Sequence, residues 1–128
     1  MRCIVIDDEP TARLELGMLL ASYGDVDDVS NARDGLDMIR EAMEASKPYD
    51  LVCLDLSMPG TDGMETLNEI RDLDDEIGLQ KTGVVVVTSS DDKSDVIEAF
   101  RRQADGYLVK PVSKQKLEAA IDRMGGTS

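Results

Sequence analysis

Short apolar runs alternate with segments of helical spacing along the whole chain, and this alternation limits the possible folds more than any other feature. The runs are continuous and mostly β-branched or aliphatic, as expected of strands covered on both faces. They occupy residues 3–6, 51–54, 84–87 and 107–109, with a weaker acidic run at 26–30 that suits an edge strand. This order predicts an α/β fold with a five-stranded parallel sheet, right-handed crossovers and helices on both faces.

Between these runs, apolar residues recur three or four positions apart, which indicates helices with one buried face. Start signals accompany three of them: Pro10 in a first turn, Asp62 three residues before Glu65, and Ser113 before the last helix. The predicted buried stripes are Ala12, Leu16, Leu19 and Tyr23; Leu36, Ile39 and Met43; Met64, Leu67 and Ile70; Val96, Ala99 and Phe100; and Leu117, Ala120, Ile121 and Met124.

The length of 128 residues and the 41% hydrophobic content fit one compact domain. We expect it to span residues 1–124. Residues 125–128 are expected to form a flexible C-terminal tail or the start of a linker. The polar stretch 72–83 is expected to end the third helix and continue as a loop. Aromatic residues make up only 3% of the chain, so the core must be aliphatic.

The formal net charge of −13 opposes binding to nucleic acid or to an anionic membrane surface. No apolar run is long enough for a signal peptide or a membrane span, so a cytoplasmic location is expected. Cys3 and Cys53 lie in apolar runs without CxxC spacing, and the chain has no histidine. We interpret both as buried hydrophobic residues, in preference to a disulfide, zinc or redox site.

Polar residues follow each central strand at its carboxyl end. They are Asp7 and Asp8 after the first strand, Asp55 after the third, Thr88 and Ser89 at the end of the fourth, and Lys110 after the fifth. Carboxyl ends of parallel strands share one edge of the sheet, where ligands bind in such folds. These side chains are therefore expected to converge.

Converging carboxylates repel one another unless a cation holds them, and oxygen ligands without His or Cys favour Mg²⁺. Lys110 and Thr88 add a positive charge and a hydroxyl donor suited to a phosphoryl group. Asp55 would be the nucleophile, because aspartate can carry a phosphoryl group covalently. We expect the apolar run before Asp55 to fix its position without burying its charge.

A simpler interpretation exists for each of these residues. Asp7 and Asp8 could be solvated acids capping the first helix, Asp55 a turn cap, Lys110 a surface residue and Thr88 an ordinary strand end. The phosphoryl-transfer interpretation is favoured because four separate strand ends each supply a required group.

Four motifs carry a resemblance to a known family: IDDEP (residues 6–10), DLSMPG (55–60) with Asp62 and Gly63, VTS (87–89) and GYLVKP (106–111). With these four motifs in this order, the chain resembles the response-regulator receiver domains of two-component signalling, and is similar to the single-domain chemotaxis response regulators. The resemblance covers essentially the whole chain. It implies a flavodoxin-like (βα)5 fold with strand order 2-1-3-4-5.

The resemblance also implies a role for each residue of the acidic edge. Asp55 corresponds to the phosphoacceptor. Mg²⁺ would be ligated by Asp8, by Asp55 and by the backbone carbonyl of Ser57, with Asp7 acting through a water molecule. Lys110 would pair first with the acceptor carboxylate and then with a phosphoryl oxygen, and the Lys110-Pro111 peptide bond would be cis.

Thr88 and Tyr107 resemble the switch pair of the family, in which a hydroxyl moves to the phosphoryl group and an aromatic ring turns inward. A simpler interpretation makes Tyr107 an edge-strand aromatic, half buried in either case. Ser57 and Ser90 occupy positions that influence phosphoryl lifetime in the family. Gln103 replaces a common helix-ending glycine, so the fourth helix is expected to end differently.

The implied partners are a sensor histidine kinase or phosphotransfer protein as donor. Output would pass to a downstream protein, or to a second copy of the chain, through the fourth helix, fifth strand and fifth helix. The chain would not be an enzyme beyond promoting its own phosphorylation and dephosphorylation.

Three alternatives use the same architecture. An aspartyl phosphatase of the haloacid dehalogenase type needs a second acid where Ser57 stands. A flavin site needs a phosphate loop where Asp7, Asp8 and Glu9 would repel the phosphate. A degenerate receiver that serves only as a docking module would not need the complete set of polar strand-end residues.

Overall fold

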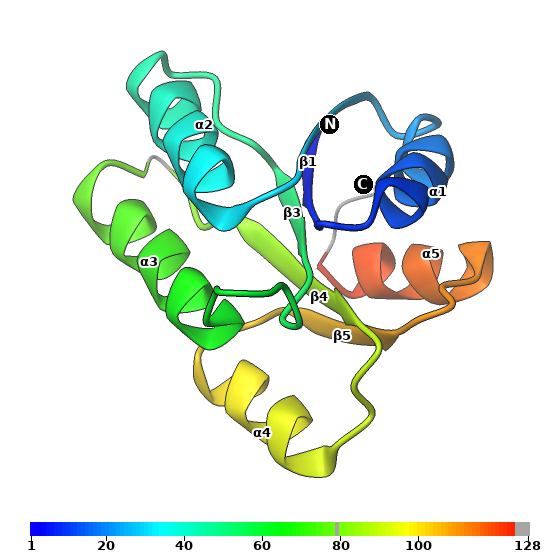
Figure 1. Ribbon diagram of the computed structural model, residues 1–128. Helices are drawn as coiled ribbons and strands as arrows, with labels where there is room; N and C mark the ends of the chain where they lie inside the picture. Colours follow the sequence, from blue (N-terminus) through cyan, green and yellow to red (C-terminus); the bar gives the residue numbers. More distant parts are fainter. Residues whose placement is uncertain (79, 125–128) are drawn as a thin grey trace.

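The computed structural model describes residues 1–78 and 80–124 (Figure 1). The described residues form five strands and five helices in strict alternation. The predicted tail at 125–128 lies outside the described residues. The elements are β1 (Arg2–Ile6), α1 (Pro10–Leu20), β2 (Asp25–Val29), α2 (Ala32–Glu44), β3 (Leu51–Leu54), α3 (Gly63–Glu76), β4 (Gly83–Thr88), α4 (Lys93–Arg101), β5 (Gly106–Val109) and α5 (Lys114–Arg123).

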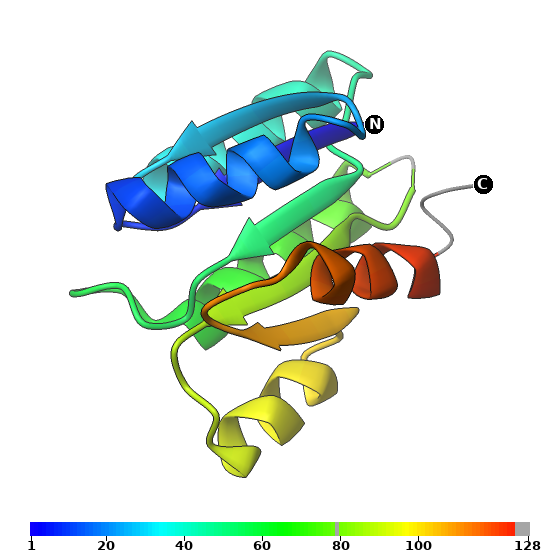
Figure 2. The same cartoon turned by 90° about the vertical axis from the view of Figure 1, so that its right-hand side faces the viewer.

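The strands form one parallel sheet in the order β2-β1-β3-β4-β5, which confirms the predicted fold and strand order. Figure 1 shows α1 and α5 on one face of the sheet and α2, α3 and α4 on the other. Figure 2 shows the strand arrows pointing the same way behind α1 and α5. Each crossover therefore places a helix against the sheet, as parallel strands require. None of the described helices has the length and apolar content needed to cross a bilayer.

The central strands are buried on both faces, because successive side chains point to opposite sides of the sheet. One set packs with α2, α3 and Ala99 of α4, and the alternate set packs with α1 and α5. The first set contains Ile4, Ile6, Val52, Leu54, Val84 and Val86; the second contains Cys3, Val5, Leu51, Cys53, Val85 and Val87. Continuous apolar runs in the sequence follow directly from this two-sided burial.

The predicted helix starts are confirmed. Pro10 is the first residue of α1. The Asp62 side chain accepts hydrogen bonds from the backbone N–H groups of Met64 and Glu65 at the start of α3, and the Ser113 side chain accepts one from the N–H of Lys116 at α5. Each cap satisfies a backbone donor that has no partner within its helix.

Two details of the predicted stripes are wrong. α1 ends at Leu20, so Tyr23 lies beyond the helix, and the stripe omitted the fully buried Leu20, although Leu19 and Tyr23 do pack, partly buried, against the core as predicted. Phe100 is 47% exposed, because the short helix α4 reaches the core through the fully buried Ala99.

The end of α4 has the backbone geometry of a glycine cap although no glycine is present, which corrects the expectation that this helix ends differently. Gln103 adopts a positive φ of 71°, a conformation that glycine usually supplies at this point. The buried guanidinium of Arg71, on α3, donates to the carbonyl oxygen of Gln103 at 2.6 Å and to that of Thr82, also at 2.6 Å. It also forms ion pairs with Asp74 and Asp105. This cluster joins α3 to the end of α4 on the side of the sheet where the strands begin.

Candidate functional site

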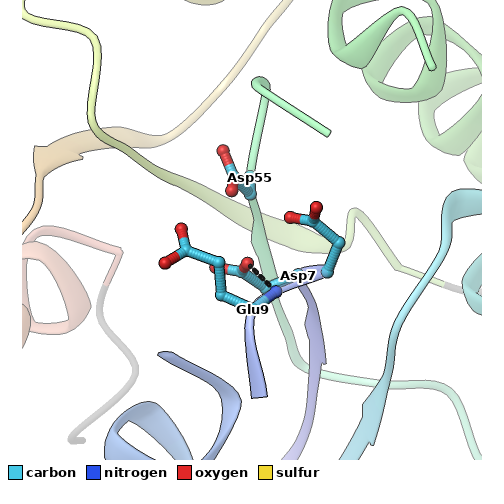
Figure 3. Close-up of side chains that lie close together, drawn as sticks. Asp7, Glu9 and Asp55 are labelled. Carbon is cyan, nitrogen blue, oxygen red and sulfur yellow. Dashed lines mark hydrogen bonds between the residues drawn. The ribbon is translucent and has the colours of Figure 1, made fainter. Parts of the chain in front are cut away.

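The predicted polar residues converge where the strands end. One ligand atom from each of Asp7, Asp8, Glu9 and Asp55 lies within 4.8 Å of the others. Figure 3 shows the carboxylates of Asp7 and Glu9 side by side beneath Asp55. Lys110 follows β5 into the same place, and its backbone N–H donates to the carbonyl of Thr88 at 2.8 Å. The parallel sheet therefore gathers residues from β1, β3, β4 and β5 at one edge.

Asp55 is buried, which corrects the expectation that its charge stays in solvent. Its side chain is only 3% exposed. Ser57 N donates to Asp55 Oδ1 at 2.8 Å, and Lys110 Nζ donates to Oδ2 at 3.1 Å. The charge can be buried because both carboxylate oxygens accept a hydrogen bond and one comes from an ammonium group.

Lys110 is shared by three carboxylates. Its Nζ lies 2.8 Å from Asp7 Oδ2, 2.9 Å from Glu9 Oε1 and 3.1 Å from Asp55 Oδ2. Burial lowers the pKa of Lys110, but its contacts with Asp7, Glu9 and Asp55 outweigh burial and raise the pKa above its ordinary value. Lys110 is therefore a permanent positive charge at neutral pH. Glu9 was not among the residues predicted for this site, although its position next to Asp8 was a usable signal.

Asp7 is the most buried acid of the cluster, at 1% exposure. Asp7 Oδ1 accepts a hydrogen bond from the N–H of Glu9 at 2.9 Å. Asp7 Oδ2 is close to the Lys110 ammonium, but the angles are outside hydrogen-bond geometry and it has no hydrogen-bond partner among the described residues. Burial raises the pKa of Asp7, and the interaction with Lys110 only partly offsets that shift. One buried carboxylate oxygen is thus available to a further donor or to a cation.

These observations fit a hard divalent cation. The cluster contains four carboxylates and one ammonium group, so it carries an excess of negative charge that a cation would neutralise. The donor atoms are all oxygens, as Mg²⁺ prefers. Asp8 is exposed, which leaves room for water beside it.

The Thr88 hydroxyl already has a partner. Thr88 is fully buried, and its Oγ1 lies 2.9 Å from the Oγ of Ser57 in a hydrogen bond. Ser57 was predicted to act through its backbone carbonyl and its position, and this contact between the two hydroxyls was not predicted. No local pattern reports it, because the two residues are 31 positions apart.

Tyr107 is half buried, as predicted, and lies beside Val86 of β4 in the sheet register. Its hydroxyl donates to the carbonyl oxygen of Ser90 at 2.9 Å, in the segment between β4 and α4. Burial is the main cause that raises the pKa of Tyr107. The Lys110-Pro111 bond is cis, as the resemblance implied.

Comparisons with known proteins agree with this geometry. The family model described as "Response regulator receiver domain" matches residues 3–122. The nitrate/nitrite response regulator protein NarL of Escherichia coli (strain K12) is 37% identical over 119 residues, covering 92% of this chain and 51% of NarL. The two-component response regulator ORR41 of Oryza sativa subsp. japonica is 34% identical, covering 91% of this chain and 88% of ORR41.

The fold is also similar to solved structures. Chemotaxis protein CheY4 of Vibrio cholerae superposes with a TM-score of 0.77 at 21% identity, covering 95% of this chain and 96% of CheY4. The chain spans about half the length of several of the curated relatives it matches. The match over residues 3–122 and the shared fold show that the chain belongs to the family of response regulator receiver domains.

Proposed function

We propose that residues 1–124 form a phosphorylation-activated switch whose phosphoacceptor is Asp55. The observation that carries the proposal is the 3.1 Å contact between Lys110 Nζ and Asp55 Oδ2 inside the acidic cluster. An ammonium group in this place neutralises the acceptor at rest and a phosphoryl oxygen after transfer. The proposed donor is a phosphohistidine of a sensor histidine kinase or a phosphotransfer protein.

In the proposed reaction, a carboxylate oxygen of Asp55 attacks phosphorus and the bond from phosphorus to the donor imidazole breaks. Ser57 N–H and Lys110 hold the acceptor carboxylate in position through its two oxygens. Mg²⁺, held by Asp8, Asp55 and the Ser57 carbonyl, and by Asp7 through a water molecule, would supply charge neutralisation at the phosphoryl oxygens. Release of the group by water makes the chain a switch and not an enzyme acting on other substrates.

The proposed response begins at Thr88. A phosphoryl group adds three acceptor oxygens, so the Thr88 hydroxyl would leave Ser57 and bond to one of them. Tyr107 would then break its hydrogen bond to the carbonyl oxygen of Ser90, and its ring would turn inward. The resulting shift in population changes the surface formed by α4, β5 and α5.

That surface is the proposed contact for a downstream protein or for a second copy of the chain. Two large apolar side chains of α4 are already exposed on it, Ile97 at 54% and Phe100 at 47%. Apolar residues exposed on one helix favour a protein partner. The net charge of −13 supports the further proposals that the domain contacts neither nucleic acid nor membrane. The two free, buried cysteines agree with a cytoplasmic location.

Incubation with phosphoramidate or acetyl phosphate and Mg²⁺, followed by intact-protein mass spectrometry, tests the proposal. The expected result is the addition of one phosphoryl group, which Asp55→Asn abolishes. A mass unchanged under all conditions would reject the proposed acceptor and favour a domain that only docks. The same adduct on Asp55→Asn would assign the phosphoryl group to another residue.

A further inference from the structure

The Glu9 side chain contacts the Lys110 ammonium group, and no role in capping the helix explains its position. It is the N-cap residue of α1, yet its side chain makes no capping hydrogen bond. Its Oε1 instead lies 2.9 Å from Lys110 Nζ, although the Glu9 side chain is 61% exposed. The ion pair with Lys110 therefore accounts for the orientation of this carboxylate.

Glu9 also marks the solvent side of the cluster. The side chains of Asp7 and Asp55 are each less than 5% exposed. Among the described residues, Glu9 is therefore the only one of the three partners of Lys110 that faces water. Beyond it opens a hollow of about 320 Å³, with Glu9 and Lys110 beside the apolar side chains of Ala12, Leu16, Pro111 and Val112. A phosphoryl donor that approaches Lys110 through this hollow passes the Glu9 carboxylate.

We infer that Glu9 is a specificity-determining residue that discriminates between phosphoryl donors by their charge. The inference rests on the proposed function and names the donor class: donors whose leaving group carries a compensating positive charge, as a phosphorylated nitrogen does. A donor oxygen needs the Lys110 ammonium, which Glu9 occupies, and a second negative charge on the donor increases its repulsion from Glu9. Glu9 can turn into water to admit the donor, because its side chain is largely exposed.

Two small phosphoryl donors that differ in net charge can test whether Glu9 discriminates by charge. Acetyl phosphate is a dianion at neutral pH, whereas phosphoramidate is a zwitterion whose protonated nitrogen offsets part of the phosphoryl charge. In both reactions an Asp55 oxygen forms the new bond to phosphorus. The broken bond is phosphorus to oxygen in the first, which releases acetate, and phosphorus to nitrogen in the second, which releases ammonia with the protons it already carries.

The test compares initial phosphorylation rates of the whole chain with each donor at saturating Mg²⁺, by mass spectrometry of quenched samples. Glu9→Gln removes the charge and keeps the size of the side chain. We expect it to raise the ratio of the acetyl phosphate rate to the phosphoramidate rate about three- to tenfold, the range for one unit charge about 5 Å away in a mostly aqueous site. Glu9→Asp, which keeps a carboxylate, should recover most of the wild-type ratio. Added salt should reduce the difference in this rate ratio between the wild type and Glu9→Gln, because salt screens the charge of Glu9.

Glu15→Gln is the matched control. Glu15 lines the same hollow but forms no ion pair with Lys110 among the contacts of the described residues, so its ratio should change less than about twofold. An equal gain with both donors, an unchanged ratio in Glu9→Gln, or the same change in Glu15→Gln would overturn the inference. Calorimetric Mg²⁺ titration adds one more check. If Glu9→Gln binds Mg²⁺ more weakly than the wild type and is phosphorylated more slowly by both donors, Glu9 is a metal ligand and the inference is wrong. If no donor phosphorylates the wild type, the proposed function has failed, and not this inference alone.

Discussion

The hydroxyl groups of Ser57 and Thr88 lie 2.9 Å apart and link the carboxyl ends of β3 and β4. Ser57 is exposed and Thr88 is fully buried, so the contact connects solvent to the interior of the site. A phosphoryl group on Asp55 would compete with Ser57 for the same hydroxyl. The resting state is therefore held in part by a bond that activation would have to break.

Ser57→Ala removes this competitor and keeps the backbone carbonyl that we assign to the metal. We expect the variant to bind beryllofluoride, a phosphoryl mimic, about two- to tenfold more tightly in the presence of Mg²⁺, because one neutral hydrogen bond contributes about 0.5–1.5 kcal/mol. Titration followed by amide NMR measures the affinity. Ser57→Thr keeps a hydroxyl and should behave like the wild type. Equal or weaker binding to Ser57→Ala would show that Ser57 does not restrain Thr88.

The crowding of carboxylates around Lys110 predicts a conflict between stability and function. Asp7→Asn removes one negative charge from a cluster of four acids and one ammonium group. Without divalent ions, we expect the free energy of unfolding to rise by about 1 kcal/mol, because repulsion is relieved and a buried charge is removed. Urea denaturation measures it.

With Mg²⁺ added, the wild type should become more stable than Asp7→Asn, since a ligand of the folded state stabilises it and the variant lacks part of the proposed metal site. Asp37→Asn, an exposed acid on α2, is the matched control and should respond to Mg²⁺ as the wild type does. A lower stability of Asp7→Asn without metal would mean that the pair with Lys110 outweighs the repulsion.

The left-handed conformation of Gln103 predicts a stabilising substitution. Gln103→Gly should raise the free energy of unfolding by about 1 kcal/mol, because glycine has no Cβ to oppose a positive φ. The Arg71 hydrogen bonds reach the backbone carbonyl and are kept. Gln103→Ala retains the Cβ and should change stability by less than about 0.5 kcal/mol. Chemical denaturation distinguishes the two variants, and a loss of stability in Gln103→Gly would contradict the explanation.

The two thiols predict both a reactivity and a pH dependence. Burial raises the pKa of Cys3 to about 11 and that of Cys53 to about 12. Because the thiolate is the nucleophile, both cysteines should react very slowly with Ellman's reagent in the native protein at pH 8 and quickly in urea. Rapid reaction of either thiol in the folded protein would contradict their burial.

The same shifts lower stability in alkali. A thiol that ionises more easily in the unfolded chain stabilises the fold fully below its unfolded pKa of about 8.5. This contribution is lost as the pH rises toward about 11 for Cys3 and about 12 for Cys53. Denaturation measured from pH 8 to 10.5 should show the decline, and the double variant Cys3→Ala, Cys53→Ala should show a smaller slope.

The strands were the easiest part to predict. Val84 to Val87 are all buried because β4 lies between two layers of helices, so every residue of the run had to be apolar. The helix starts at Asp62 and Ser113 were also predictable, since a cap depends on residues two or three positions away. Phe100 was misplaced because helical spacing identifies a face and cannot say how far that face reaches into the core.

The parts of the site that were missed involve contacts between distant segments. Lys110 and Glu9 are 101 positions apart, and Ser57 and Thr88 are 31 positions apart. Neither pair leaves a local pattern, because each residue alone is compatible with an exposed surface.

The sequence by itself determined the alternation of strands and helices along the chain. It also determined that the acids and the lysine gather at one edge, because parallel strands all end on the same side of their sheet. The tertiary structure alone decided which atoms meet. It buried Asp55 and left Asp8 exposed, shared one ammonium among Asp7, Glu9 and Asp55, and joined Thr88 to Ser57. These outcomes depend on side-chain packing between segments far apart in the chain, and burial decides how strongly each charge and hydrogen bond acts.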